Sequence, residues 1–243
     1  MATKKTPSVT MTKEDAPKTL KKHIFYGLNL DEKQEALRDA LWDEEKRIVF
    51  VNAKSGTGKT LLSVAVGLLL VRYGFYDGVL YIAAPHGYEK TGFLPGDITA
   101  KSEVFYEPLY QALISCNEDP FRVVASESMT NQKTGSGIVT AITHTFLRGS
   151  NLENKFIIVD EAQNQTENDL RKTLTRVCPN SKVVVIGHTG QIDLANAKAS
   201  GFEKCMRHFM NKEDPRVSVC ALDKNYRSWV SQVADESWEE EQE

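Results

Sequence analysis

The sequence predicts an α/β fold, with a mostly parallel sheet covered by helices on both faces. Short apolar runs rich in β-branched residues alternate with stretches of helical period, which is the pattern of βαβ units. One such run leads directly into a glycine-bearing turn and then a helix, as a parallel sheet requires. The 243 residues suit one domain of the larger α/β kind.

The strand candidates are short apolar runs that end at turn residues or charges. They are expected at Ile48–Val51, Val79–Ala83, Phe121–Ala125, Ile138–Ile142, Phe156–Val159, Lys182–Ile186 and Val217–Leu222. The polar, glycine-bearing stretch Ser126–Gly137 is expected to be a loop.

The helix candidates carry apolar residues at helical spacing or recognisable end signals. The stretch Lys59–Tyr73 is apolar nearly all round, so its helix should be central, and Gly74 ends it. Pro108 lies inside another candidate as a break signal, and Thr166 is an N-cap. Helices are expected at Asp31–Leu41, Lys59–Tyr73, Ala100–Ser115, Glu167–Val177, Gly201–Phe209 and Arg227–Ala234.

Composition excludes several classes of protein. The hydrophobic fraction of 41% and charged fraction of 26% rule out disorder throughout, collagen and a disulfide scaffold. The net charge of −3 provides no global basic field for nucleic acid. Residues 1–22 hold six lysines against two acids, a net charge of +4, whereas residues 235–243 hold six acids and no base. We therefore expect a flexible basic arm at 1–22, one domain at 23–234 and an acidic tail at 235–243.

Neither a zinc site nor a membrane segment is expected. The four cysteines form no C-x-x-C pair, and with five scattered histidines they make no zinc pattern. The first residues lack the apolar core of a signal peptide. The longest apolar run, Leu61–Val71, is too short to cross a bilayer. A cytoplasmic protein with no membrane partner is expected.

The strongest motif is the stretch AKSGTGKT between a predicted strand and a predicted helix, the context of a P-loop. Glycines let backbone N–H groups surround phosphate oxygens, the lysine reaches the β- and γ-phosphates, and the threonine hydroxyl can bind Mg²⁺. The usual first glycine is replaced by Ala53. The competing interpretation is a glycine-rich turn with an incidental lysine. The candidate ATP-binding residues are Lys54, Ser55, Gly56, Thr57, Gly58, Lys59 and Thr60.

A second motif places two acids at the end of a strand. After Phe156–Val159 come Asp160 and Glu161, which a parallel sheet brings to the P-loop edge. Asp160 can hold Mg²⁺ through water, and Glu161 can act as the base for an attacking water. The alternative is a solvated acidic turn. Gln191, after a later strand, is a candidate sensor of the γ-phosphate, or else part of an ordinary strand-to-loop connection.

With these motifs, residues 29–234 resemble the PhoH family, a RecA-like P-loop domain similar to the first domain of superfamily 1 helicases. The resemblance is to the phage-type members, so a host cytoplasm is implied if a phage encodes the chain. It implies ATP hydrolysis with Mg²⁺, coupled to RNA or single-stranded DNA; a slowly hydrolysing switch is the alternative. The supporting stretches are Lys90–Asp97, Leu147–Gly149, Asp160–Asn164, Leu174–Arg176 and Gln191–Leu194.

The resemblance also implies residue roles. Lys59, Thr60, Asp160 and Glu161 match the phosphate, Mg²⁺ and catalytic positions, and Gln34 resembles a glutamine that reads adenine, the alternative being an exposed helix residue. Two departures from the family pattern stand out. They are His188 in place of an aspartate, and Ala84-Pro85 in place of the Arg-Pro that precedes a nucleic-acid-contacting loop.

A single RecA-like domain implies assembly. Because an efficient site needs an arginine at the γ-phosphate, we expect one in trans within a homo-oligomeric, hexameric ring. Arg227 is the first candidate for this catalytic arginine, and Arg148 and Arg176 are the alternatives.

Overall fold

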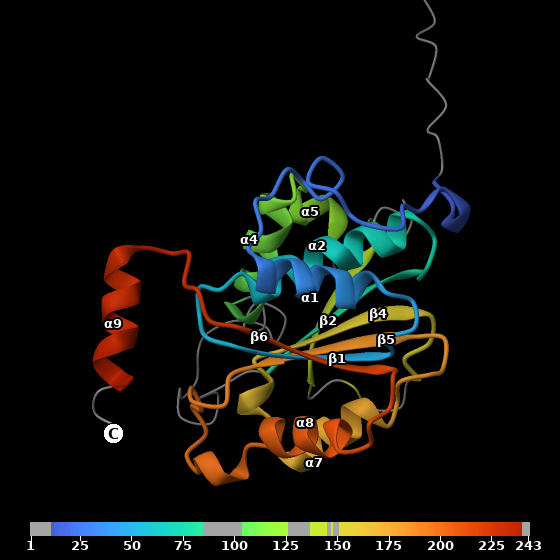
Figure 1. Ribbon diagram of the computed structural model, residues 1–243. Coiled ribbons are helices and arrows are strands. Elements are labelled where there is room, and N and C mark those ends of the chain that lie inside the picture. Colours follow the sequence, from blue (N-terminus) through green and yellow to red (C-terminus); the bar gives the residue numbers. More distant parts are fainter. Residues whose placement is uncertain (1–10, 85–103, 126–136, 145–146, 148–150, 240–243) are drawn as a thin grey trace, which may run out of the picture.

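The computed structural model contains a single six-stranded sheet in which every strand pair is parallel (Figure 1). The structure describes residues 11–84, 104–125, 137–144, 147 and 151–239, with side chains to residue 234. The strand order is β3-β2-β4-β5-β1-β6, which confirms the predicted fold class. The strands are β1 (Ile48–Ala53), β2 (Gly78–Ala83), β3 (Val139–Thr143), β4 (Lys155–Asp160), β5 (Lys182–Gly187) and β6 (Val217–Leu222).

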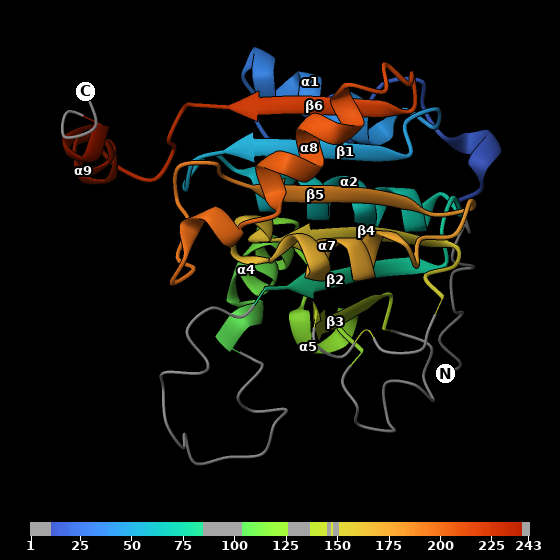
Figure 2. The ribbon, with the colours of Figure 1, turned by 90° about the horizontal axis from the view of Figure 1, so that it is seen from below.

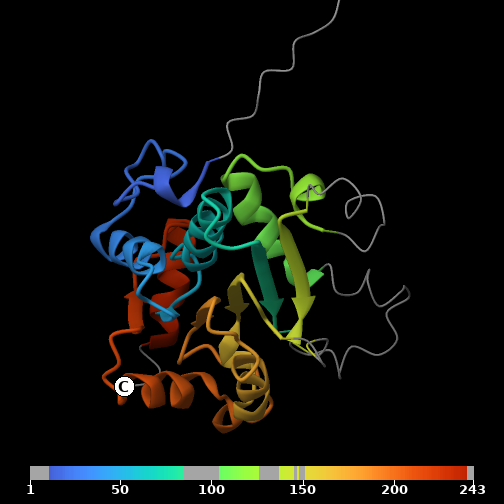
Figure 3. The same ribbon diagram turned by 90° about the vertical axis from the view of Figure 1, so that its right-hand side faces the viewer.

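Helices cover both faces of this sheet. Helices α1, α2, α4 and α5 lie on one face and α7 and α8 on the other, and the end-on view separates the two layers (Figure 3). Helix α9 stands apart. The helices are α1 (Glu32–Trp42), α2 (Lys59–Arg72), α4 (Glu107–Ser115), α5 (Pro120–Val123), α7 (Glu167–Leu174), α8 (Phe202–Met210) and α9 (Trp229–Glu239). Short 3-10 turns lie at Lys13–Asp15, Val104–Tyr106, Ala162–Asn164 and Ala197–Ala199.

The core consists of two apolar layers, one on each face of the sheet. Along β1, Val49 and Val51 point into the layer beneath α2, whereas Ile48 and Phe50 point into the layer above α7 and α8. This alternation is the two-residue period of a strand. Helix α2 is buried along most of its length, as its apolar sequence predicts.

Two predicted elements differ from the structure. The expected strand Phe121–Ala125 is wrong: its first residues form the helical turn α5, because Asp119 caps the Phe121 amide and Pro120 occupies the first turn. Val124 forms only an isolated bridge with Val139. Pro108 lies in the first turn of α4 instead of breaking the helix, since proline is tolerated there.

The expected domain ends also differ. Within residues 11–22, Leu20 is buried and the Trp42 Nε1 donates to the Pro17 carbonyl at 2.9 Å, so this part of the arm packs on the domain. Helix α9 continues to Glu239, into the expected acidic tail. Residues 1–10, 240–243 and all but Gly137 of the expected loop 126–137 lie outside the described residues. In the described chain, every helix is too short or too polar to span a bilayer.

The sheet topology determines where the motifs meet. Strand β5 lies between β1, which leads into the P-loop, and β4, which ends in Asp160. All the strands run the same way, so their carboxyl ends share one edge, the edge toward which the arrowheads point in Figure 2. In open parallel sheets, ligands bind at this edge.

Candidate nucleotide-binding site

The P-loop follows β1 and curls over the first turn of α2. Gly56 and Gly58 have φ angles of 78° and 84°, in the left-handed region that glycine adopts without strain. The buried Thr57 hydroxyl donates to the Lys54 carbonyl at 3.0 Å, which closes the loop. Lys59 is the first residue of α2, so the helix N-terminus and the ammonium group face the same space. Both favour an anion.

Asp160 joins three parts of the chain. Its carboxylate accepts hydrogen bonds from the Thr60 hydroxyl at 2.9 Å, the Tyr81 hydroxyl at 2.8 Å and the Glu161 backbone N–H at 2.9 Å. The carboxylate is buried, and burial together with its negative charge raises the pKa of Tyr81 well above the ordinary value. Tyr81 therefore stays a neutral donor. Sequence reasoning did not identify Tyr81, because its residue type is common in buried strands.

Glu161 lies beside this contact with an unusual backbone. Its φ angle of 51° is left-handed, which is strained for a glutamate and common at functional sites. Burial raises the pKa of Glu161, and the charge of Asp160 raises it further. Gln163 was not identified as a separate candidate, although it lies in the Asp160–Asn164 motif. Its Nε2 donates to Glu161 Oε2 at 2.6 Å, and its Oε1 accepts the His188 amide at 3.2 Å.

Gln191 does not line this pocket. Asn164 and Asp193 exchange two hydrogen bonds, of 2.9 and 3.1 Å, which fix the segment after β5 while Gln191 remains exposed. The glutamine that contacts Glu161 is Gln163, from the acidic motif itself.

Gln34 lies at the other side of the P-loop. It is buried, so the alternative of an exposed helix residue is wrong. Its Nε2 donates to the Thr57 carbonyl at 2.9 Å, while its Oε1 accepts the Asp31 amide at 3.2 Å within the N-terminal cap of α1. The amide therefore couples α1 to the P-loop and lines the pocket.

The segment Asn225–Arg227 crosses the P-loop of its own chain. The Tyr226 amide donates to the Gly56 carbonyl at 2.9 Å. A β-carbon on Gly56 would lie 2.4 Å from Asn225 Oδ1 and 3.1 Å from Arg227 Cγ. Arg227 thus lines the pocket in cis, unlike the expected arginine in trans, because the backbone contact at Gly56 holds it there.

The two alternative arginines are not at this pocket. The Arg176 carbonyl accepts the Leu152 amide at 2.9 Å, just before the amino ends of β4 and β5 and thus at the opposite edge of the sheet. Arg148, the stretch Lys90–Asp97 and the loop after Ala84 lie outside the described residues.

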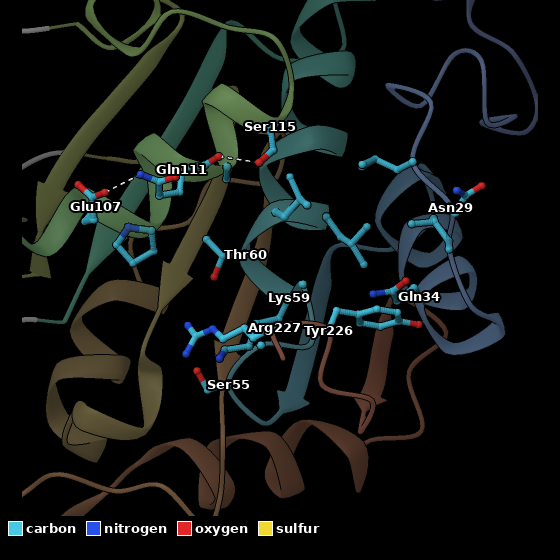
Figure 4. A pocket seen from close by; sticks show the side chains of 18 of the residues that line it. Asn29, Gln34, Ser55, Lys59, Thr60, Glu107, Gln111, Ser115, Tyr226 and Arg227 are labelled. Atoms are coloured by element: carbon cyan, nitrogen blue, oxygen red, sulfur yellow. Dashed lines mark hydrogen bonds between the residues drawn. The ribbon is translucent and has the colours of Figure 1, made fainter. Parts of the chain in front are cut away.

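The P-loop, Gln34, Glu161 and the pair Tyr226-Arg227 line a cavity of about 620 Å³ (Figure 4). The phosphate end is formed by Lys59, Thr60, Glu161 and Arg227. Away from it, the cavity reaches Gln34 and Tyr226 on one side and helix α4 on the other, where Glu107 and Gln111 are hydrogen-bonded to each other. The volume is within the range of small-molecule and cofactor sites, about 300–1,000 Å³.

The oxygen ligands at the phosphate end suit Mg²⁺. Thr60 Oγ1 and Asp160 Oδ2 are 2.9 Å apart, and both are the hard oxygen donors that Mg²⁺ prefers. In the described ranges, no cluster of three or more His, Cys, Asp or Glu residues could hold a metal. A site with few protein ligands is typical of Mg²⁺ bound with water and substrate phosphates.

Comparison with known proteins gives consistent matches. The chain is 33% identical over 178 residues to a PhoH-like protein of Synechocystis sp., covering 73% of this chain and 51% of that protein. It is 31% identical over 183 residues to Protein PhoH of Escherichia coli strain K12, covering 74% and 49%. The chain therefore spans about half the length of these relatives.

A solved structure of the Sulfolobus solfataricus SWI2/SNF2 ATPase core in complex with dsDNA also matches. The TM-score is 0.46 and the sequence identity 17%, over 80% of this chain and 45% of that one. The family model described as PhoH-like protein matches residues 29–236. This chain belongs to the PhoH family.

Proposed function

We propose that the chain binds ATP with Mg²⁺ in the pocket at the P-loop and hydrolyses it. The observation that carries the proposal is the 2.9 Å hydrogen bond between Thr60 and Asp160, because it joins the phosphate loop to the acidic strand. A phosphate cradle alone would serve binding. The half-buried Glu161 beside it supplies a group that can accept a proton from water.

Each residue then has a role that follows from its place. The P-loop amides and Lys59 bind the β- and γ-phosphates, while Thr60 and Asp160 would hold the metal. Bound Mg²⁺ would offset the negative charge of the phosphates. Glu161 accepts the proton of the attacking water, and Gln163 orients its carboxylate. Arg227 lies in cis, where its guanidinium can stabilise charge on the γ-phosphate.

The base of the nucleotide is proposed to lie toward Gln34 and Tyr226. After donating to Thr57, Gln34 Nε2 keeps one N–H, and Oε1 keeps one lone pair. The N–H can donate to N7 of adenine, and the lone pair can accept from its N6 amino group. The Tyr226 hydroxyl donates to Asp31 at 2.5 Å, which fixes the ring at the pocket wall. We propose that this end selects adenine.

Coupling to RNA or single-stranded DNA is the finer part of the proposal. It is supported by the family resemblance and by the lysines of the N-terminal segment, Lys13, Lys18, Lys21 and Lys22. Because the net charge is −3, such binding must use a local patch, tolerate many sequences and fall steeply with salt.

The test is phosphate release by the purified full chain, with and without poly(U), at two salt concentrations. We expect Lys59→Ala to abolish turnover because it removes the phosphate contact. Glu161→Gln should keep ATP binding, measured by a fluorescent analogue, but lower kcat by about 10²–10⁴-fold. Lys212→Ala and Glu45→Gln make the same chemical changes at exposed positions and serve as matched controls.

The possible outcomes distinguish ATP hydrolysis from a nucleotide-dependent switch. If Glu161→Gln hydrolyses ATP at the parent rate, the assignment of the base is wrong. If the parent chain binds ATP without turnover, with or without poly(U), the alternative of a nucleotide-dependent switch replaces the hydrolase.

A further inference from the structure

Helix α9 exposes an apolar face. Figures 1 and 2 both show it standing clear of the sheet and of the helices that cover it, beyond the carboxyl ends of the strands. The exposed fractions of Trp229, Val230 and Val233 are 73%, 67% and 42%. Val233 follows Trp229 by four residues and Val230 by three, so it shares one side of the helix with both. A helix of 11 residues is marginal in water without a packed face.

The root of α9 is nevertheless fixed to the domain. Asn225 is buried, its Nδ2 donates to Ser231 Oγ at 2.7 Å, and its carbonyl accepts Gln232 Nε2 at 2.9 Å. The helix therefore leaves the domain in a defined direction, with its apolar face directed away from the chain's own core. A projecting helix of this kind needs a surface outside its own molecule.

The same chain carries a groove of suitable chemistry between α7 and α8. Its volume is about 980 Å³, larger than the nucleotide pocket. Apolar side chains line it, among them Leu174, Ile192 and Phe209. Five basic residues border it against two acids, Glu167 and Glu203. The basic residues are Arg171, Lys198, Lys204, Arg207 and His208.

Helix and groove are complementary in charge and size. From residue 235 to residue 243 the sequence has six acids and no base, opposite in sign to the groove border. Eleven residues of helix span about 16 Å and the nine of α8 about 14 Å, so the lengths match. The exposed Trp229 shows that α9 does not occupy the groove of its own chain.

We propose that α9 of one copy docks into the α7–α8 groove of a second copy. Trp229 and Val233 would pack on the apolar lining, with the C-terminal end of α9 toward the basic border. The two surfaces are different, so the contact is head-to-tail and can continue from copy to copy.

The test uses two full-chain double variants with complementary defects. Trp229→Ser with Val233→Ser removes the helix face but leaves the groove intact. Arg171→Glu with Lys198→Glu reverses charge at the groove border but leaves the helix intact. Both pairs are exposed side chains, so the fold should survive, and thermal melting by circular dichroism checks this. Ile114→Ser, an exposed apolar residue of α4, is the matched control.

Sedimentation velocity gives the readout. We expect the parent chain and Ile114→Ser to form concentration-dependent oligomers, and each double variant alone to sediment as a monomer. An equimolar mixture of the two variants should form a dimer and nothing larger, because only one helix and one groove remain competent. Monomeric parent protein at all concentrations would overturn the proposal. So would folded helix variants that assemble like the parent, or a mixture that stays monomeric.

Discussion

At the scale of single residues, the side chains of the site are held in place by hydrogen bonds to one another. Asp160 is held by Thr60 from the P-loop helix and by Tyr81 from the neighbouring strand. Gln163 holds Glu161 and, through its other amide atom, the first residue after β5. Preorganised contacts of this kind fix the acids at the geometry that proton transfer needs.

Gln163 contributes to the pKa of the proposed base. Its hydrogen bond to Glu161 lowers the pKa of that carboxyl, against the larger upward effect of burial. A base must be deprotonated, so activity falls as the pH drops through its pKa. We expect Gln163→Ala to move the acid limb of the kcat profile to higher pH, in addition to lowering kcat.

Gln165→Ala, at a neighbouring buried glutamine, is the matched control for that shift. A Gln163→Ala profile parallel to the parent profile, lower in rate but unshifted, would mean that Gln163 does not tune Glu161.

The sequence predicts a site residue when the features that identify it lie close together in the chain. Lys59, Thr60 and Asp160 are recognisable because a short segment carries both the residue type and its strand or helix context. Tyr81 and Tyr226 are not recognisable, because their partners are 79 and 195 residues away and only folding brings them together. Arg227 was recognised as a residue, but its placement in cis depends on the backbone contact at Gly56.

At the scale of elements, α2 packs closely against β4. A β-carbon on Gly67 would lie 2.7 Å from Phe156 Cδ1, and Phe156 is fully buried, so it has little room to move. The missing side chain lets the helix approach the sheet. Since α2 begins at the P-loop and β4 ends at Asp160, this contact also spaces the two halves of the site.

Replacing Gly67 tests this contact against helix propensity. Alanine favours a helix by about 1 kcal/mol over glycine, but overpacking a core costs about 1–3 kcal/mol. We expect Gly67→Ala to destabilise the protein by up to about 2 kcal/mol in urea unfolding. Adding Phe156→Leu should recover part of the loss, with a coupling energy above about 0.5 kcal/mol. Strictly additive effects would show that the two side chains do not compete for space.

The sequence predicts most elements because their signals are local and strong. Six of the seven expected strands are present, each at an apolar run of the sequence. The seventh, Phe121–Ala125, has the same apolar composition, yet Asp119 and Pro120 start a helical turn there. Cap chemistry outweighed β-propensity over so short a run.

At the scale of the whole molecule, Lys182 ties the amino edge of the sheet to α1. Its buried ammonium group donates to the carbonyls of Leu41 and Asp43 at 2.5 and 2.6 Å, at the C-terminus of that helix. Burial lowers the pKa of Lys182 from its usual 10.5 to about 7. Proton binding at this one group therefore bears on the stability of the entire fold.

The sign of the effect follows from linkage. Between about pH 7 and pH 10 the unfolded chain binds a proton that the folded chain has released, so this group makes stability rise with pH. The gain is at most about 1.4 kcal/mol for each pH unit. We expect the free energy of unfolding of the parent, minus that of Lys182→Met, to increase between pH 7 and pH 9.5 in urea titrations. A constant difference across this range would show that the lysine keeps its ordinary pKa.

Gly56 shows how a mutational scan of this protein could mislead. A glycine in a P-loop invites the explanation that phosphate needs the space, and a Gly56→Ala variant that loses nucleotide would seem to support it. Here the space is already filled by Asn225, so an added methyl group would collide with the polypeptide before any ligand arrived. A truncation before Asn225 would disrupt the same contact from the opposite side. If both changes caused the same loss of nucleotide binding, the shared cause would be the lost contact between Gly56 and Asn225. The result would then carry no information about phosphate.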